Sequence, residues 1–392
     1  MANTFDLIIL GAGCAGLSLA TRLASSIPYS LRVLVVEARS SYTNDRTWCF
    51  WGADSLAPAH APEYQWRHMR LTSGARTVLV DCESTPYQML PASKFYDSAL
   101  AVISMAKNIT LKLDTVVWSD PAKIDGHWEL ETNAGVFSGR MVVDTRPQQL
   151  PARDGALLWQ SFYGKEIECD KAVFDPSRMD LMNFLPPDHT CVPFVYVLPT
   201  AANKALVELT VFGADPLRPE DLALMLETEI ARRTGDSPFR VLRSEHGILP
   251  MGLRAAPKNP DCSYVRVGVM AGGARPSTGF AFQRIQRWAN VCAKSILAGF
   301  LPLAHAPDPA VLRVMDHLFL KVLRANPEQG GELFCSLFGM VDTTRVIRFL
   351  NGDGGWLDYV AVVSALPFSP FMRFLSKHRA VRVGQQGAGQ NV

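Results

Sequence analysis

The stretch Phe5–Gly16, which reads FDLIILGAGCAG, decides the fold of this chain. An apolar run ends in three glycines spaced G-x-G-x-x-G and is followed by a helical pattern, which predicts a strand, a tight turn and a helix. Gly11 makes the turn, Gly13 lets a pyrophosphate approach the backbone, and Gly16 lets the helix pack against the strand. The phosphates of a dinucleotide would then lie at the helix N-terminus.

A second strand pattern supports this interpretation. Residues Leu31–Val36 are mostly apolar and lead into Glu37, about twenty residues past the glycines, where a ribose-binding carboxylate belongs. An acidic residue here favours a free ribose, as in FAD or NAD, over a 2′-phosphate. The alternative is a glycine-rich turn that arose by chance. We expect a dinucleotide-binding βαβ unit.

Composition bounds the class of protein. With 392 residues, 48% of them apolar, the chain can bury a large core in one large domain or two interleaved ones. The net charge of +2 is dispersed apart from residues 373–382, so nothing indicates a nucleic-acid partner. The eight cysteines and eight histidines lack metal-ligand spacing, which favours a reduced, cytoplasmic chain without a metal site.

The sequence patterns that could indicate contact with a membrane are weaker than those for nucleotide binding. No signal-peptide pattern precedes the first strand, and the longest apolar runs fall short of the roughly 20 residues that a spanning helix needs. The run Tyr359–Leu375 is mostly apolar and is followed by Lys377, His378, Arg379 and Arg382. This combination suits a helix pair partly seated in the membrane interface, or a core helix with a frayed tail.

The segment after Glu37 allows two interpretations. Arg46, Trp48 and Phe50 lie in a polar loop that runs into an aromatic cluster. The loop either plugs the core or places Arg46 near the cofactor phosphates and the two rings near a ligand. Further along the chain, Asp144 ends a strand pattern close to where the ribityl chain of a flavin could lie.

The sequence pattern changes between Trp159 and Phe212. Strand-like runs rich in proline and aromatic residues here predict a second domain with an antiparallel sheet. Glu208 stands inside an otherwise apolar strand. If that face is buried, the pKa of Glu208 is raised and its carboxyl group can exchange protons at neutral pH. The alternative is an outward-facing glutamate on an edge strand. Asp180 offers a second carboxylate in this domain.

A late element returns to the first domain. Residues Val265–Met270 form a buried-strand pattern, and a turn rich in glycine and proline leads from them into a long amphipathic helix. A helix N-terminus here predicts a second phosphate-facing or flavin-facing element, as is typical of FAD folds. The candidate cofactor contacts are Gly272, Pro276, Thr278 and Gly279.

These patterns predict an α/β chain, α+β overall. We expect a Rossmann-like FAD-binding domain over residues 1–155, which resumes over 246–300. A substrate domain with an antiparallel sheet is expected over 156–245. The remaining residues, 301–392, are expected to be helical and could contact a membrane.

At this point the chain resembles the bacterial lycopene beta-cyclases, with similarity in order along most of its length. The matching positions are Gly11–Gly16, Thr47-Trp48-x-Phe50, Phe162, Gly164, Met179-Asp180, Phe194-Val195-Tyr196-x-Leu198-Pro199, Glu208, Thr210, Gly247-x-x-Pro250 and Pro276-x-Thr278-Gly279. Members often have Asp-Gly where this chain has Asp144-Thr145, and Asp-Thr where it has Leu209-Thr210. The chain also lacks the G-D-A motif of flavin hydroxylases at residues 272–274, which favours the cyclase branch.

The resemblance implies a flavoprotein that needs reduced FAD, with NAD(P)H as reductant, yet performs no net redox chemistry. It implies conversion of the psi ends of lycopene to beta-ionone rings by proton addition, ring closure and proton loss. An apolar substrate, together with the run Tyr359–Leu375 and its cationic flank, predicts a cytoplasmic protein attached peripherally to the inner membrane. The glutamate that matches Glu208 is regarded as essential in this family.

Protonating an alkene makes a carbocation, so the site must supply an acid, exclude water and stabilise positive charge. We assign proton exchange to Glu208, alone or with the flavin, and support of that carboxylate to Asp180. Trp48, Phe50 and Tyr196 are candidates for the substrate lining. Two other functions stay open: a flavin-dependent monooxygenase or polyprenyl reductase acting on an apolar isoprenoid, and a non-catalytic carrier of flavin or isoprenoid at the membrane surface.

Overall fold

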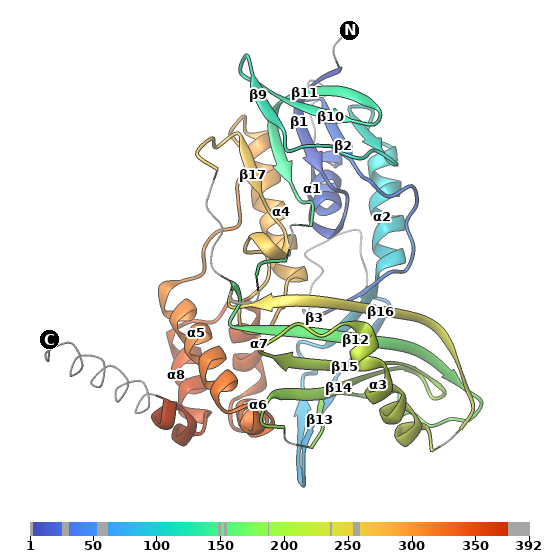
Figure 1. The fold of residues 1–392 in the computed structure, drawn as a ribbon, viewed down its shortest axis with the longest axis vertical. Coiled ribbons are helices and arrows are strands. Elements are labelled where there is room, and N and C mark those ends of the chain that lie inside the picture. Colours follow the sequence, from blue (N-terminus) through green and yellow to red (C-terminus); the bar gives the residue numbers. More distant parts are fainter. Residues whose placement is uncertain are drawn as a thin grey trace, which may run out of the picture. The chain divides into compact units, whose positions relative to one another are not determined.

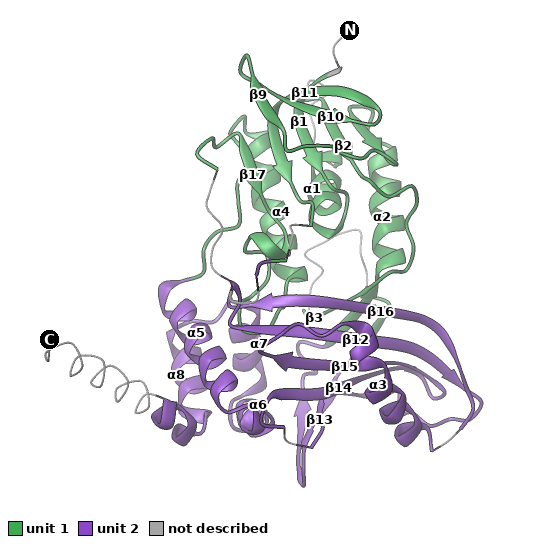
Figure 2. Cartoon of the chain, in the orientation of Figure 1, with its two compact units in different colours: residues 1–65, 87–150, 254–308 green, residues 66–86, 151–253, 309–392 purple. Residues whose placement is uncertain are grey.

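The computed structural model describes residues 3–25, 31–52, 62–147, 150–152, 155–186, 188–235, 237–253 and 259–374. The chain forms two compact units, each assembled from separated segments (Figure 1, Figure 2). Unit 1 holds residues 1–65, 87–150 and 254–308, and unit 2 holds 66–86, 151–253 and 309–392. The excursion of residues 66–86 into unit 2 is not among the sequence-based expectations.

Unit 1 is built on a seven-stranded sheet in the order β8-β2-β1-β11-β10-β9, with β17 also paired to β11. Its strands are β1 (Asn3–Leu10), β2 (Val33–Val36), β8 (Ile109–Lys112), β9 (Ala122–Ile124), β10 (His127–Thr132), β11 (Gly135–Asp144) and β17 (Tyr264–Arg266). Strands β8, β2, β1, β11 and β17 run parallel, while β10 and β9 are antiparallel additions. The predicted nucleotide-binding strand therefore lies inside a Rossmann-like sheet.

The core of unit 1 follows from the alternation of side chains along its strands. Leu7 and Ile9 pack with the helices α1 (Cys14–Ala24), α2 (Ala92–Ser104) and α4 (Phe282–Leu297). Ile8 and Leu10 point the other way, into a second cluster. All four side chains are fully buried, and each contributes about 1.5–3 kcal/mol. Burial of both faces explains why β1 is a continuous apolar run in the sequence.

Unit 1 also contains a small sheet in the order β3-β7-β4. Its strands are β3 (Thr47–Trp51), β7 (Tyr87–Pro91) and β4 (Tyr64–Trp66). Outside this sheet, a short 3₁₀ helix, η2 (Val269–Ala271), follows β17. Residues 47–51, expected in a loop, thus form a strand. The backbone pairing of β3 with β7 fixes where its aromatic side chains lie.

Unit 2 is organised around a long, mostly antiparallel sheet in the order β16-β12-β15-β14-β13-β5-β6. The strands are β5 (His68–Ser73), β6 (Arg76–Asp81), β12 (Leu158–Cys169), β13 (Arg178–Phe184), β14 (Cys191–Ala201), β15 (Lys204–Gly213) and β16 (Phe239–Met251). Helix α3 (Pro219–Thr234) packs on one face against an aliphatic cluster that includes Val207 and Leu209. We call this the α3 face and the other side the opposite face.

The C-terminal part of unit 2 is helical. It comprises α5 (Ala310–Ala325), η3 (Pro327–Gln329), α6 (Gly330–Met340), α7 (Thr343–Asn351) and α8 (Trp356–Ala365). Helix α6 packs against β5 and β6, and Phe334 from α6 contacts Phe184 and Phe212 on the opposite face. In the described part of the chain, no helix is long and apolar enough to cross a membrane.

Candidate active site

The glycine turn after β1 is shaped for close backbone approach. Gly11 has a positive φ of 85°, and a Cβ atom on Gly16 would lie 2.0 Å from the carbonyl oxygen of Gly11. Gly13 differs, because none of the described atoms lies within 4 Å of the place its Cβ would take. It is the N-cap of α1 and provides no side-chain cap, and the first turn of that helix has no acidic residue. The helix N-terminus therefore suits an anion such as a pyrophosphate.

Glu37, directly after β2, lies beside this turn. Its buried carboxylate accepts hydrogen bonds from the backbone N–H of Ala12 (2.7 Å) and from the backbone and guanidinium of Arg39 (3.0–3.1 Å). Although burial alone would raise it, these donors hold the pKa of Glu37 below its usual value. Sequence reasoning missed Arg39. Its position two residues after Glu37 was the available signal.

Arg46 lies at the same end of α1. Its guanidinium is mostly exposed and pairs with Asp45 (2.9 Å), and its charge acts on the thiol of Cys14, the first residue of α1. This places a cation near the helix terminus where the sequence predicts phosphates. A direct phosphate contact stays a prediction.

Trp48 and Phe50 project from β3 into an aromatic cluster of unit 1. Phe50 is buried and stacks on Phe282 at 4.7 Å between centroids, and Trp48 meets Phe95 edge-on at 4.9 Å. These rings join the core that α1, α2 and α4 cover. The geometry therefore supports the core-plug interpretation, and contact of either ring with a ligand stays a prediction.

Asp144 ends β11, and its buried carboxylate is held by neighbours. It accepts hydrogen bonds from the hydroxyl of Tyr264 (2.6 Å) and from Arg146 (2.8 and 2.9 Å). Burial alone would raise its pKa, but these donors keep the pKa of Asp144 below its ordinary value. The next residue is Thr145, where the resemblance predicts glycine. Its hydroxyl oxygen lies 2.9 Å from the carbonyl oxygens of Leu10 and Gly11, so threonine fits against the glycine turn.

The late element forms a compact turn before α4. Gly272 and Gly279 adopt positive φ angles of 93° and 72°, with Pro276 and Thr278 between them. The N–H of Gly279 donates to the carbonyl of Arg275 at 2.9 Å and closes the turn. Such conformations suit glycine and let the backbone approach a ligand, but cofactor contact by these four residues stays a prediction.

A half-buried histidine supports this turn. The Nε2 atom of His305 accepts a hydrogen bond from the N–H of Gly268 at 3.1 Å. Burial, with the charge of Arg284, lowers the pKa of His305 to about 4, so the ring is neutral at pH 7 and can accept. A Cβ on Gly273 would lie 2.9 Å from that nitrogen and 2.6 Å from the carbonyl oxygen of Gly268. The turn is thus tightly packed from both sides.

In unit 2, one row of residues crosses four strands at Glu208. Tyr196 on β14 pairs with Glu208 on β15, which pairs with Gly164 on β12, which pairs with Glu245 on β16. Directly paired residues point to the same side of a sheet, so all four lie on the opposite face. A Cβ on Gly164 would lie only 3.2 Å from the Cβ of Glu208. The glycine therefore leaves the space that lets the two glutamates meet.

The carboxyl group of Glu208 has a strongly perturbed environment. Glu208 is half-buried, and desolvation raises its pKa to about 8. The charge of Glu245 and a hydrogen bond between the two side chains contribute to this rise. The hydroxyl of Thr210 donates to Oε1 of Glu208 at 3.2 Å and partly offsets the rise. Glu208 is therefore mostly protonated at pH 7, as a general acid must be. Sequence reasoning missed Glu245, although Arg243, Glu245 and Gly247 alternate at strand period.

The next row explains other matching positions. Phe194, Thr210, Phe162 and Gly247 pair in turn across the same four strands. A Cβ on Gly247 would lie 2.6 Å from the ring of Phe162, so only glycine leaves room for that ring. Positions that are scattered in the sequence thus gather on the opposite face, around Glu208.

Asp180 lies elsewhere. It pairs with Val197, whose side chain belongs to the aliphatic cluster under α3, and with Arg70 on β5. Its carboxylate takes a bidentate ion pair from Arg70 at 2.6 and 2.9 Å. The structure therefore puts Asp180 on the α3 face and does not bring it to Glu208. Its catalytic role stays a prediction that this geometry does not support.

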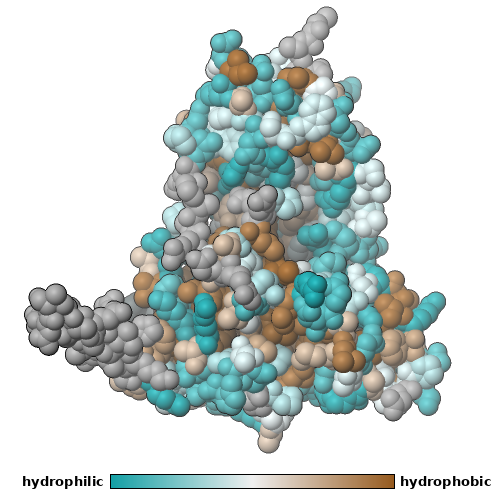
Figure 3. Space-filling model, in the orientation of Figure 1, coloured by the Kyte–Doolittle hydropathy of each residue, from teal (hydrophilic) through white to brown (hydrophobic). Residues whose placement is uncertain are grey.

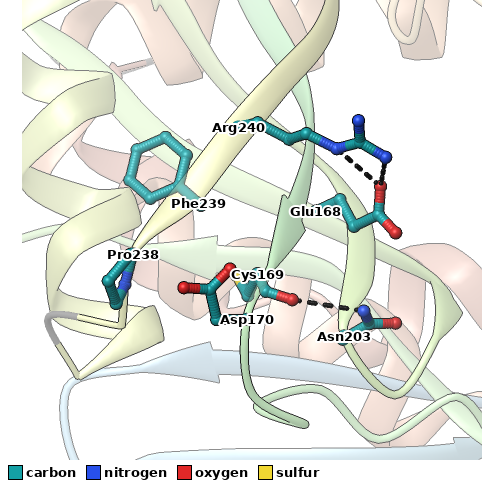
Figure 4. A pocket seen from close by; sticks show the side chains of 7 residues that line it. All are labelled: Glu168, Cys169, Asp170, Asn203, Pro238, Phe239 and Arg240. Carbon is teal, nitrogen blue, oxygen red and sulfur yellow. Dashed lines mark hydrogen bonds and ion pairs between the residues drawn. The ribbon is translucent and has the colours of Figure 1, made fainter.

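A pocket elsewhere in unit 2 is polar. Figure 4 shows the Arg240 guanidinium paired with Glu168 (2.6 Å) and the Asn203 amide bonded to the carbonyl of Cys169 (3.2 Å). The lining is Glu168, Cys169, Asp170, Asn203, Pro238, Phe239 and Arg240. None of the predicted site residues lines it, and its charges suit a small polar molecule rather than an apolar one.

Comparisons with known proteins agree with the resemblance. Residues 6–376 match the sequence model of the family described as lycopene cyclase protein. A lycopene beta-cyclase of Pseudescherichia vulneris is 25% identical over 399 residues, covering 93% of this chain and 95% of that protein.

Solved structures share the fold at lower identity. A flavin-dependent brominase has a TM-score of 0.63 at 14% identity, covering 96% of this chain and 99% of the other. A geranylgeranyl bacteriochlorophyll reductase-like protein of Thermoplasma acidophilum has a TM-score of 0.59 at 14% identity, covering 96% of each chain. The expected α/β fold with a Rossmann-like unit is confirmed.

Proposed function

The chain belongs to the lycopene cyclase family, and we propose that it converts the open psi ends of lycopene to beta-ionone rings, giving gamma-carotene and beta-carotene. Each ring forms when a proton adds to a terminal alkene, the resulting cation closes on a second alkene, and a ring proton leaves. Atoms and electrons balance without an oxidant. The enzyme is thus an isomerase-type cyclase.

The observation that carries this proposal is the half-buried carboxyl group of Glu208, which strand pairing brings into one row with Glu245 and close to aromatic residues. Because its pKa is raised, the carboxyl group of Glu208 carries a proton at neutral pH. The proton that leaves the ring then restores the protonated form of Glu208. The aromatic rings of Tyr196, Phe162 and Phe194 lie in the rows through and beside Glu208. Such rings exclude water and stabilise a nearby cation.

We propose FAD as the cofactor, in reduced form and with NAD(P)H as the reductant. The uncapped N-terminus of α1, the open space at Gly13 and the carboxylate of Glu37 suit a dinucleotide. Arg46, Asp144 and the turn from Gly272 to Gly279 are the further contacts proposed. Reduced flavin, when bound, supplies negative charge that stabilises positive charge in the reaction.

Pigment analysis tests the reaction. Co-expression with a lycopene-producing pathway should convert lycopene to beta-carotene, and purified enzyme should consume far less than one NAD(P)H per ring. Stoichiometric consumption with an oxygenated or saturated product would instead favour the monooxygenase or polyprenyl reductase. Tight binding of flavin or isoprenoid without any product would indicate a carrier.

We also propose attachment to the cytoplasmic surface of the inner membrane. Helix α8 packs through Tyr359 and Val362 but exposes Trp356 (71%), Leu357 (66%) and Val363 (59%). Exposed apolar patches of this kind mark interaction surfaces, and Trp and Leu suit the membrane interface. The face drawn in Figure 3 mixes hydrophilic and hydrophobic residues. The cationic residues expected to flank this region, Lys377, His378, Arg379 and Arg382, lie outside the described residues.

Vesicle flotation tests the attachment. The double variant Trp356→Ser, Leu357→Ser should bind anionic vesicles at least about 10²-fold less, since burial of each side chain is worth roughly 1.5–3 kcal/mol. Leu224→Ser on α3, where Leu224 is 78% exposed, is the matched control and should bind normally. High salt should release the wild type only in part. Equal binding of all three proteins would contradict the proposal.

A further inference from the structure

Glu245 is a buried acidic residue of unit 2 that is not among the positions of the family resemblance. It is buried, and it forms an ion pair with Arg243 two positions earlier on the same face of β16. Adjacent strands lie about 4.8 Å apart, so the backbones of Glu208 and Glu245 are roughly 10 Å apart across β12. Two glutamate side chains can span that gap only because Gly164 lies between them.

Charged groups continue from Glu245 toward the end of the sheet. Arg243 pairs with Glu166 through Nε at 2.7 Å, and Lys204 binds the other oxygen of Glu166 at 2.7 Å. Lys204 begins β15 at the hairpin and is partly exposed. Glu245 is thus fixed by an ionic chain, whereas the hydrogen-bonding partners of Glu208 include the neutral hydroxyl of Thr210 and the carboxyl group of Glu245.

We infer that Glu245 is a positioning residue for the proton chemistry of Glu208: held by Arg243, it accepts a hydrogen bond from the protonated carboxyl group and keeps the proton there until the substrate takes it. This inference rests on the proposed function. When the O–H bond of Glu208 breaks and a C–H bond forms on the substrate, two carboxylates face each other. Their repulsion makes Glu208 a strong base, which favours recovery of a proton from the ring. In this role Glu245 keeps its ion pair with Arg243.

The groups that face Glu208 define the expected pH dependence. They are Tyr196 from β14, Thr210 from its own strand, and Glu245 and Arg243 from β16. Arg243 favours the ionised form of Glu208 and Glu245 disfavours it. Removal of the Glu245 charge should therefore lower the pH at which Glu208 loses its proton.

The test uses flavin-loaded enzyme and two measurements. Infrared difference spectra, with the band assigned by its loss in Glu208→Gln, give the pH midpoint of the protonated carboxyl group without any turnover. The pH profile of cyclisation gives the midpoint of its alkaline limb. In Glu245→Gln both midpoints should fall by about one pH unit or more. Glu168→Gln, which breaks an exposed ion pair with Arg240 between β12 and β16, should leave them unchanged.

A second variant keeps the inference testable if Glu245→Gln does not fold. In Gly164→Ala the new Cβ would lie 3.4 Å from Oε2 of Glu208 and should push the two carboxyl groups apart, which again lowers the midpoint. An unchanged infrared midpoint in whichever of the two variants folds would overturn the inference. If the wild type forms no cyclised carotenoid, the proposed function fails, and the infrared midpoints still decide whether Glu245 controls the proton on Glu208.

Discussion

Two glutamates, one in each unit, have pKa values shifted in opposite directions. One follows the end of strand β2 and the other lies in the middle of strand β15. Glu37 in unit 1 is surrounded by donors, the N–H of Ala12 and the guanidinium of Arg39, and its pKa is lowered. Glu208 in unit 2 faces another carboxyl group, and desolvation together with that neighbour raises its pKa to about 8. Burial favours a raised pKa at both carboxyl groups, but the donors around Glu37 reverse that rise, whereas the carboxyl group beside Glu208 adds to it.

This difference shows that the groups next to a buried carboxyl group determine whether it stays charged or holds a proton. A carboxylate held by donors stays charged and can accept hydrogen bonds from ribose hydroxyl groups for the life of the complex. A carboxyl group beside a second carboxylate holds a proton near neutral pH and can give it up and take it back. These properties suit the binding role proposed for Glu37 and the proton-transfer role proposed for Glu208.

The largest expected effect comes from Glu208→Gln, which keeps the size of the side chain but removes proton exchange. We expect a folded variant that takes up FAD and cyclises lycopene at least about 10²-fold more slowly. Pigment analysis and flavin absorbance measure the two properties separately. Near-normal beta-carotene formation would break the comparison, because Glu208 would then be structural and the flavin alone would handle the proton.

The glycine turn provides a second test, on the binding side. Gly13→Val should fold, because the space at Gly13 is open within the described residues, yet its side chain should exclude the pyrophosphate and abolish flavin uptake. Gly16→Ala should instead lower the stability of the whole unit, since its Cβ would lie 2.0 Å from the carbonyl oxygen of Gly11. Flavin titration and thermal melting distinguish the two. Unchanged flavin affinity in folded Gly13→Val would falsify the assignment of the turn.

The smallest effect, on the order of a few degrees in melting temperature, is in the pH dependence of stability. The raised pKa of Glu208 stabilises the fold below its unfolded value of 4.5, and this contribution is lost as pH rises to about 8. The lowered pKa of Glu37 stabilises the fold above 4.5, and this contribution is lost on acidification.

Melting curves of wild type, Glu208→Gln and Glu37→Gln across this range measure both contributions. The wild type should lose stability relative to Glu208→Gln between pH 4.5 and 8, and relative to Glu37→Gln only below about pH 4.5. Parallel curves for all three proteins would show that neither glutamate is perturbed as the structure indicates.

The sequence by itself determined the Rossmann-like unit. The roles of Gly11, Gly13 and Gly16 depend on backbone conformation and on spacing within one turn, so they can be recognised from neighbouring residues. The apolar runs of β1 and β2 likewise follow from burial on both faces. Glu208 was visible as a lone acid in an apolar strand, and the resemblance pointed to it as essential.

Only the tertiary structure decided what surrounds those residues. The sequence placed Asp180 beside Glu208, but strand register puts Asp180 on the α3 face with Arg70 and puts Glu245, 37 positions after Glu208 in the chain, across Gly164 from it. Register is set by pairing between distant strands, and a shift of one residue exchanges the two faces of a sheet. The pKa of Glu208 therefore depends on pairing that no local pattern encodes.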